Sequence, residues 1–454
     1  IGTWTLSGSN IYSGSTTLNN GQLVVSGSNG AILGTSGITL NPGAILKLVN
    51  SATTNNPNRL SDTAAITLKG GMLVFTNSGA ECFAERAGAL LLNANSNVLV
   101  TSQAETGYTS AVTFASLSRT GSGLLDFRGD GLGVDDRNRV FFAAPPAEGL
   151  IGLWATVNGT EFAAYSNAFG VVPAGEGVFT DIPARGPYAV ADDAALDARI
   201  NVQGGDAELP ITLAGSGTSR LKSLLQNSEW SSTVAMTNTT LQLNEVMIAA
   251  GKQALTLGTD ANEGWVMPSA SGGSVALINR SADNALTLNA GITNNTAASS
   301  VGKYGPGTVK LAGWNSYTGP TLIDEGVLEF AGSLNQRLSG AISGAGTLVK
   351  SGTNQLQLLA ANTFTGPVYI NGGIVRPDQN TAFGSTNSGV FIADGATLDL
   401  GCDSAVGGTR GGDSLNMGLE PFTVSGAGVG GAGAIVCNGG QNQSVAINLI
   451  SLAG

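Results

Sequence analysis

One motif recurs along this chain, and it limits the possible folds more than any other feature of the sequence. It occurs at residues 10–14 (NIYSG), 315–319 (NSYTG) and 362–366 (NTFTG). In each copy a second glycine follows seven residues after the first, and an apolar residue comes soon after it. A unit this small cannot bury a hydrophobic face alone, so the copies are expected to stack into one continuous core.

Within these units, apolar and polar residues alternate with the period of a β-strand. Short turns rich in Gly and Asn interrupt the alternation. The first strand candidates are residues 16–18, 22–25, 38–40 and 44–48, and the same rhythm returns at 66–68, 72–75 and 285–288. Stacked coils of such strands predict an all-β fold, a right-handed parallel β-helix (β-solenoid) with a looped or elaborated middle section.

Composition supports many short strands joined by tight turns. Glycine supplies 67 of the 454 residues, and charged residues make up only 11% of the chain, against a usual share of about 25%. Hydrophobic residues reach 42%, which is enough for a packed core and excludes a disordered chain.

The ionisable residues exclude several classes of function. The chain has no histidine, so it lacks the commonest general base and the commonest transition-metal ligand. Its net charge of −11 argues against nucleic acid and anionic membrane surfaces as partners. The sequence shows no transmembrane stretch, so no membrane insertion of this segment is expected. The sequence predicts no cofactor and no enzymatic activity.

The segments around residues 2–25 and 305–330 resemble the autotransporter-associated β-strand repeat of large bacterial surface and secreted proteins. The shared features are a Gly-x-Gly-Thr start, the Asn-x-aromatic-x-Gly motif and the glycine that follows it. The resemblance is weaker at 344–376, where extra residues separate the two halves of the motif. It implies a β-solenoid passenger region that is exported and displayed, hence an extracellular or cell-surface location, and it implies no catalytic activity.

Three sections are predicted: solenoid coils at 1–139, an elaborated or looped section at 140–245, and further coils at 246–454. Aromatic residues gather in the middle section, where they form either a local core or a partner-binding surface. Residues 219–226 (SRLKSLLQ) are predicted to form a short helix. The aromatic residues in question are Phe141, Phe142, Trp154, Phe162, Tyr165, Phe169, Phe179, Tyr188 and Trp230.

The two ends of the chain read together as one Gly-x-Gly-Thr motif, because the last residues (ISLAG) complete the first ones (IGTWTLSG). The first hypothesis is therefore a structural building block of an extracellular fibre or surface layer, whose copies join head to tail by strand addition. The residues expected at this interface are Ile1, Gly2, Thr3, Trp4, Leu6, Ile450, Leu452, Ala453 and Gly454.

Two alternatives remain open at this point. In the first alternative the chain is an adhesin passenger that binds surface glycans or a neighbouring cell. In the second, which the sequence favours least, it is a glycan-active lyase or hydrolase of the β-helix type. The enzyme would need carboxylates or cationic side chains that converge in one groove. Its candidate acid pairs are Asp324 with Glu325 and Asp260 with Glu263.

Three further features attract attention. Oxygen-bearing side chains at Asp130, Asp135 and Asp136 offer a weak calcium site, against the alternative of an acidic turn paired with arginines. Residues 128–130 form an Arg-Gly-Asp triplet that nothing else in the sequence supports. The cysteines are Cys82, Cys402 and Cys437. Two alternatives stay open: Cys402 and Cys437 form one disulfide, or all three remain free thiols.

Overall fold

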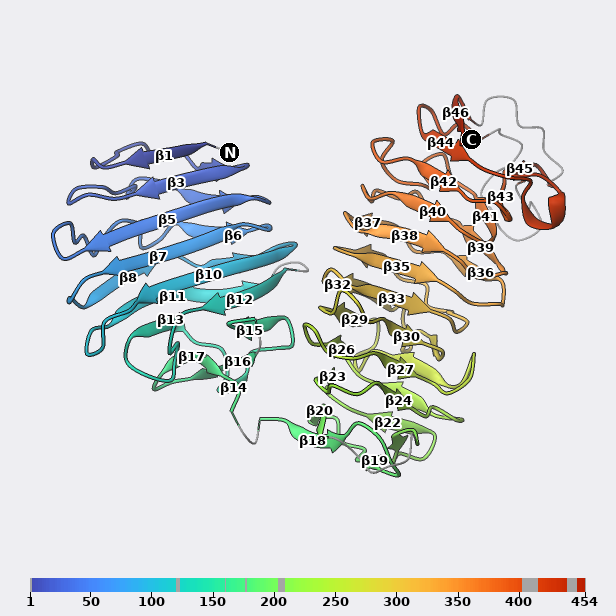
Figure 1. The fold of residues 1–454 in the computed structure, drawn as a ribbon, viewed down its shortest axis with the longest axis horizontal. Helices are drawn as coiled ribbons and strands as arrows, with labels where there is room; N and C mark the ends of the chain where they lie inside the picture. The colour runs from blue at the N-terminus through green and yellow to red at the C-terminus, as the bar shows by residue number, and fades with distance from the viewer. Residues whose placement is uncertain are drawn as a thin grey trace. The chain divides into compact units, whose positions relative to one another are not determined.

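The computed structural model describes residues 2–119, 123–159, 161–175, 178–202, 209–401, 415–438 and 447–453. The chain forms two compact units, Ile1–Val178 and Phe179–Gly454. Among the described residues, every regular element is a strand except one 3-10 turn, Val429–Gly431. Figure 1 shows each unit as a stack of roughly parallel strands, which confirms the predicted β-solenoid. No helix in the described part of the chain is long and apolar enough to cross a membrane.

Unit 1 contains two sheets. The first, in spatial order, is β1 (Thr3–Leu6), β3 (Gly21–Val25), β5 (Ala44–Ser51), β7 (Met72–Ser78), β10 (Ser96–Gln103), β12 (Leu124–Arg128), β15 (Ala155–Val157), β16 (Glu161–Ser166) and β14 (Gly149–Leu150), with β17 (Gly170–Pro173) beside β16. The second is β13 (Asn138–Ala144), β11 (Ser110–Arg119), β9 (Leu90–Leu92), β6 (Ala65–Leu68), β4 (Gly37–Leu40) and β2 (Thr16–Leu18), with β8 (Phe83–Ala87) beside β11.

Unit 2 contains two long sheets. One is β18 (Thr180–Pro183), β20 (Asp197–Val202), β23 (Ser223–Gln226), β26 (Glu245–Ile248), β29 (Ser274–Asn279), β32 (Ser300–Tyr304), β34 (Thr321–Ile323) and β37 (Ile342–Gly344). The other is β24 (Ser232–Val234), β27 (Leu255–Leu257), β30 (Leu286–Leu288), β33 (Thr308–Leu311), β35 (Val327–Phe330), β38 (Thr347–Lys350), β40 (Val368–Ile370), β42 (Val390–Ile392), β44 (Pro421–Val424) and β46 (Leu449–Leu452).

The described part of unit 2 also contains three shorter sheets. They are β22 (Thr218–Arg220), β25 (Thr240–Gln242), β28 (Trp265–Met267) and β31 (Gly291–Ile292); β36 (Gln336–Leu338), β39 (Gln355–Leu358), β41 (Gly373–Pro377), β43 (Ala396–Asp399) and β45 (Ile435–Val436); and the pair β19 (Ala189–Val190) and β21 (Thr212–Leu213).

The core of each unit is built from residues at the same position in successive coils. In unit 1 an inward ladder passes through Leu23, Leu46, Leu73, Leu99 and Phe127, each paired with the next across parallel strands. The last four of these side chains are fully buried. Because strand side chains alternate between faces, the period-two pattern of the sequence places one apolar residue on each rung.

Glycines at the corners let neighbouring coils approach closely. A Cβ at Gly366 would lie 2.0 Å from the carbonyl oxygen of Gly346, and one at Gly352 would lie 1.9 Å from that of Gly332. No Cβ fits at such distances, so glycine is required wherever another coil lies directly behind it. This explains why the glycines of the repeat recur at fixed positions.

The predicted helix at residues 219–226 is wrong, because this segment forms the end of β22 and the whole of β23. Leu224 and Leu225 are both buried although they point to opposite faces of the sheet. Leu224 pairs with Ala198 on one side and Val246 on the other. Burial on both faces of a central strand outweighs the helical preference of Leu, Lys and Gln.

The antiparallel strand pairs in the described part of the chain all fall within residues 149–173. β16 pairs antiparallel with β14, β15 and β17, at the end of unit 1. The section 140–245 thus contains both this departure from the parallel stack and the first coils of unit 2.

Candidate functional site

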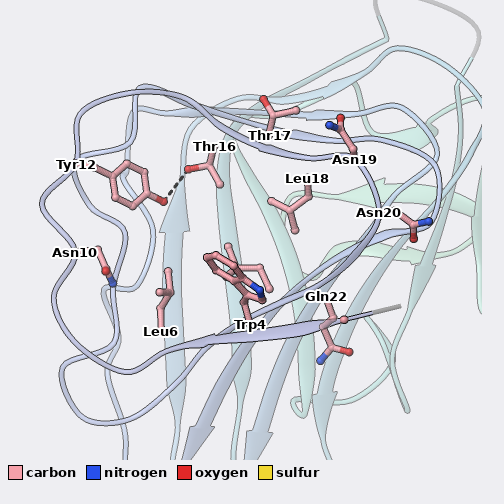
Figure 2. A pocket seen from close by; sticks show the side chains of 12 residues that line it. Trp4, Leu6, Asn10, Tyr12, Thr16, Thr17, Leu18, Asn19, Asn20 and Gln22 are labelled. Carbon is pink, nitrogen blue, oxygen red and sulfur yellow. Dashed lines mark hydrogen bonds between the residues drawn. The ribbon is translucent and has the colours of Figure 1, made fainter.

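The first coil of unit 1 leaves an apolar groove open to solvent, here called the open-end groove. Figure 2 shows Trp4, Leu6 and Leu18 lying along this groove. Its volume is about 640 Å³. Trp4 pairs with Leu23 on the inward ladder and nevertheless is 76% exposed. The full lining is Gly2, Trp4, Leu6, Asn10, Tyr12, Thr16, Thr17, Leu18, Asn19, Asn20, Gln22 and Leu23.

The second copy of the motif shows what covers the same surface inside the solenoid. The hydroxyl of Tyr12 lies 2.8 Å from that of Thr16, and the equivalent Tyr317 and Thr321 hydroxyls are also 2.8 Å apart. Tyr12 is 39% exposed, whereas Tyr317 is 2% exposed. The local structure of the two copies is thus the same, and the difference is the coil that precedes the second copy.

That preceding coil supplies β30, which pairs in parallel with β33. Leu286 and Leu288 stack on Val309 and Leu311, and all four are fully buried. By the alignment of the repeats, Val309 and Leu311 correspond to Trp4 and Leu6. The open-end groove therefore corresponds to the surface that the preceding coil covers in the second copy of the repeat.

The other predicted interface residues lie on β46 and beside it. Ile450 and Leu452 are in register with the buried Phe422 and Val424 of β44, yet they are 49% and 83% exposed. The amide of Ala453 donates to the carbonyl of Val424 over 2.9 Å. Gly2 and Thr3 are exposed at the other end, while Ile1 and Gly454 lie outside the described residues.

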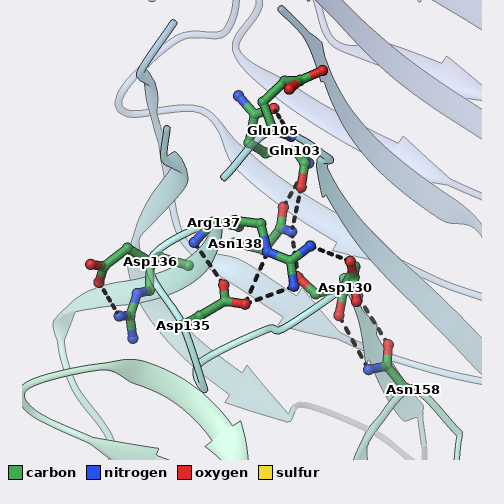
Figure 3. Close-up of polar contacts among 10 residues, drawn as sticks. Gln103, Glu105, Asp130, Asp135, Asp136, Arg137, Asn138 and Asn158 are labelled. Carbon is green, nitrogen blue, oxygen red and sulfur yellow. Dashed lines mark hydrogen bonds and ion pairs between the residues drawn. The ribbon is translucent and has the colours of Figure 1, made fainter. Parts of the chain in front are cut away.

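The acidic turn between β12 and β13 is an arginine–carboxylate network (Figure 3). Arg137 pairs with Asp130 and, over 2.7 Å, with Asp135, which lowers the pKa of the Asp135 carboxyl. Asp136 pairs with Arg139 over 2.7 Å. The three proposed calcium ligands thus face two different guanidinium groups. No group of three or more His, Cys, Asp or Glu side chains in the described ranges is arranged to hold a metal ion.

The Arg-Gly-Asp triplet belongs to the same turn. Arg128 donates to the buried carboxylate of Asp126 over 2.6 Å, and Asp130 pairs with Arg137. Arg128 and Asp130, the two charged residues of the triplet, are therefore both in ion pairs within this chain. Of the cysteines, Cys82 is an exposed free thiol and Cys437 is exposed, but Cys402 lies outside the described residues, as does any pairing that involves it.

The proposed acid pairs lie on turns. Asp324 and Glu325 precede β35, and Asp324 is buried. The carbonyl of Glu325 accepts a hydrogen bond of 2.7 Å from Nζ of Lys303, whose pKa burial lowers to about 7. These contacts join neighbouring coils, so Lys303 and Glu325 have a structural role here.

Glu263 closes a turn over its neighbouring coil. Its carboxylate accepts bonds from the hydroxyls of Thr237 and Thr259 and from the amides of Met236, Thr259 and Asp260, the first and last of these amides at 3.0 and 2.9 Å. Burial opposes the charge, but these donors outweigh it and lower the pKa of Glu263 to about 2.

Acidification is expected to weaken unit 2 through Glu263. Its folded pKa lies below its unfolded value of 4.5, so its stabilisation is present above pH 4.5 and is lost as the pH falls towards 2. Glu263→Gln should lower the free energy of unfolding by about 1–3 kcal/mol at pH 6 and remove part of the acid dependence. Urea denaturation from pH 6 to pH 2 checks this, with the exposed Asp283→Asn as control. Equal acid dependence in Glu263→Gln and the wild type would contradict it.

The aromatic residues of the middle section serve two purposes. Phe75, Phe114, Phe142 and Tyr165 form a continuous internal stack with ring centroids 5.8–6.3 Å apart. Trp230 is different, because it is 39% exposed beneath the guanidinium of Arg185. The interpretation as a local core thus holds for Phe142 and Tyr165, but not for every aromatic residue in the section.

Sequence reasoning missed a pair of tryptophans in unit 2. Trp265 and Trp314 meet edge to face with ring centroids 5.8 Å apart. A signal was present, because Trp314 stands directly before the Asn of the repeat, where the other copies have Ser9 and Ala361.

The fold and the open-end groove define a β-solenoid protein built from coil-stacking repeats. Residues 1–25, 302–330 and 348–376 match the passenger-associated-transport-repeat family. The chain is also similar to "Adhesin BmaC autotransporter" of Brucella suis biovar 1 (strain 1330), at 27% identity over 309 residues, 67% of this chain and 8% of that protein. No solved structure matches. The chain carries autotransporter passenger repeats, as its resemblance predicted, and it spans less than a tenth of this relative.

Proposed function

We propose that this chain is a non-enzymatic segment of a bacterial adhesin, displayed at the cell surface or secreted, and built from β-solenoid units. The three passenger repeats support this proposal, together with the similarity to a relative described as an adhesin autotransporter. Stacked coils suit this role, because each coil contacts only its neighbours and each unit presents a repetitive surface.

Surface display tests the adhesive role. The chain is fused to an autotransporter translocator and exposed on a bacterial surface that lacks adhesins of its own. Cells that display it should bind host-cell monolayers or immobilised matrix proteins better than cells that display an unrelated β-solenoid. Equal attachment of the two strains at equal display would contradict an adhesive role.

The finer proposal is end-to-end assembly, in which β46 of one copy adds to β1 of the next. The inward pair Ile450 and Leu452 has the same spacing as Trp4 and Leu6. Ile450, Leu452 and Trp4 are exposed, and Leu6 is partly buried. The partner strand would thus stack on β1 as β30 stacks on β33. Covering Trp4 and Leu6 removes large apolar side chains from water, which favours association. Such contacts propagate without closing.

Gly14 offers a clean test of this assembly. It is equivalent to Gly319 and Gly366, where a Cβ would lie 2.4 Å and 2.0 Å from a carbonyl oxygen of the preceding coil. A Cβ at Gly14 would have no neighbouring atom within 4 Å. Gly14→Ala should therefore fold normally but weaken head-to-tail association at least about tenfold, as measured by analytical ultracentrifugation. Wild-type protein that stays monomeric at high concentration, or a variant that associates equally well, would overturn the proposal.

A further inference from the structure

A second groove lies on unit 2 and is here called the Trp314 groove. Its volume is about 350 Å³. It crosses three successive segments, which follow β33, contain β36 and follow β39. Its lining is Trp314, Asn315, Ser316, Tyr317, Thr318, Asn335, Arg337, Ser339 and Leu359.

Trp314 forms a rigid exposed platform in this groove. It is 43% exposed, and its amide donates to Oδ1 of Asn262 over 2.7 Å, a contact between residues 52 apart in the chain. Trp265 supports its ring edge to face, with an angle of 66° between the ring planes. A Cβ at Gly291 would lie 2.8 Å from the ring of Trp265, so glycine makes room for this support. A side chain held in place this way loses little entropy when it binds a ligand.

The solenoid itself does not require tryptophan at this position. Ser9 and Ala361 occupy it in the other two copies of the repeat, and the Asn and Gly that follow are the same in all three. The fold is therefore satisfied by a small residue. An exposed tryptophan where the repeat needs none, held by an edge-to-face partner and a long-range hydrogen bond, indicates a binding surface.

Apart from Trp314, Tyr317 and Leu359, the residues that line the groove are polar, and the one charge among them is positive. Arg337 is the only charged residue that lines the groove, although the whole chain carries a net charge of −11. Thr318, Asn335 and Ser339 are exposed beside it, and Oδ1 of Asn335 accepts a bond of 2.9 Å from the amide of Gln355, which orients its side chain. Hydroxyl, amide and guanidinium groups next to an aromatic face match the mixed polar and C–H surface of a sugar.

We propose that the Trp314 groove binds an acidic saccharide. The C–H face of one sugar ring packs on the electron-rich face of the indole, and the carboxylate of a uronic acid pairs with the guanidinium of Arg337. The side chains of Asn335 and Ser339 offer hydrogen-bond partners to ring hydroxyls. This inference deepens the proposed adhesin role by naming a ligand class, and that role stands or falls separately in the display experiment.

Calorimetric titration of the purified chain tests this site. The probes are oligosaccharides of hyaluronan, chondroitin and polygalacturonate, with chitotetraose and a dextran oligosaccharide as neutral probes of similar length. The wild type should bind at least one uronate-containing probe more tightly than the neutral ones. Trp314→Ala should weaken that binding at least about tenfold, and Arg337→Gln should abolish the preference for the acidic probe.

Tyr369→Ala is the matched control. Tyr369 is also exposed and stacks on another aromatic ring, that of Phe391, but it lies on a strand face outside the groove. The Tyr369→Ala variant should bind the uronate probe with the same affinity as the wild type, and circular dichroism should show that all three variants are folded. The proposal is overturned if no uronate probe binds at millimolar concentration, if neutral probes bind equally well, or if Trp314→Ala retains wild-type affinity.

Discussion

Gly366→Ala is expected to destabilise unit 2 by about 2–4 kcal/mol, whereas Gly14→Ala leaves the stability of unit 1 nearly unchanged. The two glycines occupy the same position in the repeat, and neither adopts the left-handed backbone conformation that disfavours alanine. The added methyl group at 366 would lie 2.0 Å from the carbonyl oxygen of Gly346, and backbone cannot move aside as a flexible side chain can.

The comparison isolates coil-on-coil contact from every other property of glycine. If Gly366 were needed only for chain flexibility, both alanine variants would behave alike, each slightly more stable through lower entropy of the unfolded chain. If close approach of the coils is the reason, only Gly366→Ala has a lower free energy of unfolding than the wild type. Urea denaturation of the two variants separates these outcomes, and a free energy of unfolding for Gly366→Ala within about 0.5 kcal/mol of the wild type would contradict the stacking explanation.

The sequence was sufficient for the parts of the fold that repeat locally. Alternation in residues 44–48 predicted β5, and the recurrent motif predicted that coils stack, because both signals depend on neighbours within a few residues. The helix prediction for residues 219–226 failed because this segment forms a strand that is buried between β20 and β26. That burial depends on the length of each coil, which varies along this chain. The local sequence pattern therefore does not show which strands will flank the segment.

The candidate sites divide in the same way. Trp4 and Leu6 were predicted to lie at a head-to-tail interface because the two ends of the chain together read as one copy of the repeat start, and the structure places both in the open-end groove. The Trp265–Trp314 pair joins residues 49 apart, and its support by Asn262 and Gly291 exists only once three coils are stacked. A sequence pattern shows the position of a residue within its own coil. A site such as the Trp265–Trp314 pair is formed by contacts between coils, so the pattern does not predict it.

Unit 1 is expected to lose stability as the pH rises from 5 to 9, on account of Glu85. This side chain is 1% exposed and accepts bonds of 3.1 Å from the amides of Arg59 and Leu60. Burial raises its pKa to about 8, against 4.5 for the unperturbed group. Since the folded value is the higher one, its contribution is fully present below pH 4.5 and is lost as the pH rises through 8. The expected loss is on the order of 3 kcal/mol.

Glu85→Gln should remove this pH dependence, because the amide has the same shape, carries no charge and still offers one oxygen to the two backbone N–H donors. The variant is then about as stable as the wild type at pH 5 and more stable at pH 9. Glu85→Ala differs in kind: it leaves the buried amides of Arg59 and Leu60 without acceptors and should cost about 2–4 kcal/mol across the whole range.

The measurement must report on unit 1 alone, because unit 2 has buried titrating groups of both kinds. Burial raises the pKa of Glu420 to about 7 and lowers that of Lys303 to about 7, so their effects on a global transition oppose each other. Hydrogen exchange of peptides from β6 to β9, corrected for the intrinsic pH dependence of exchange, gives the local opening free energy. A wild-type value that does not change between pH 5 and pH 9 would show that Glu85 stays charged, with its two backbone donors and the nearby Arg59 outweighing the cost of burial.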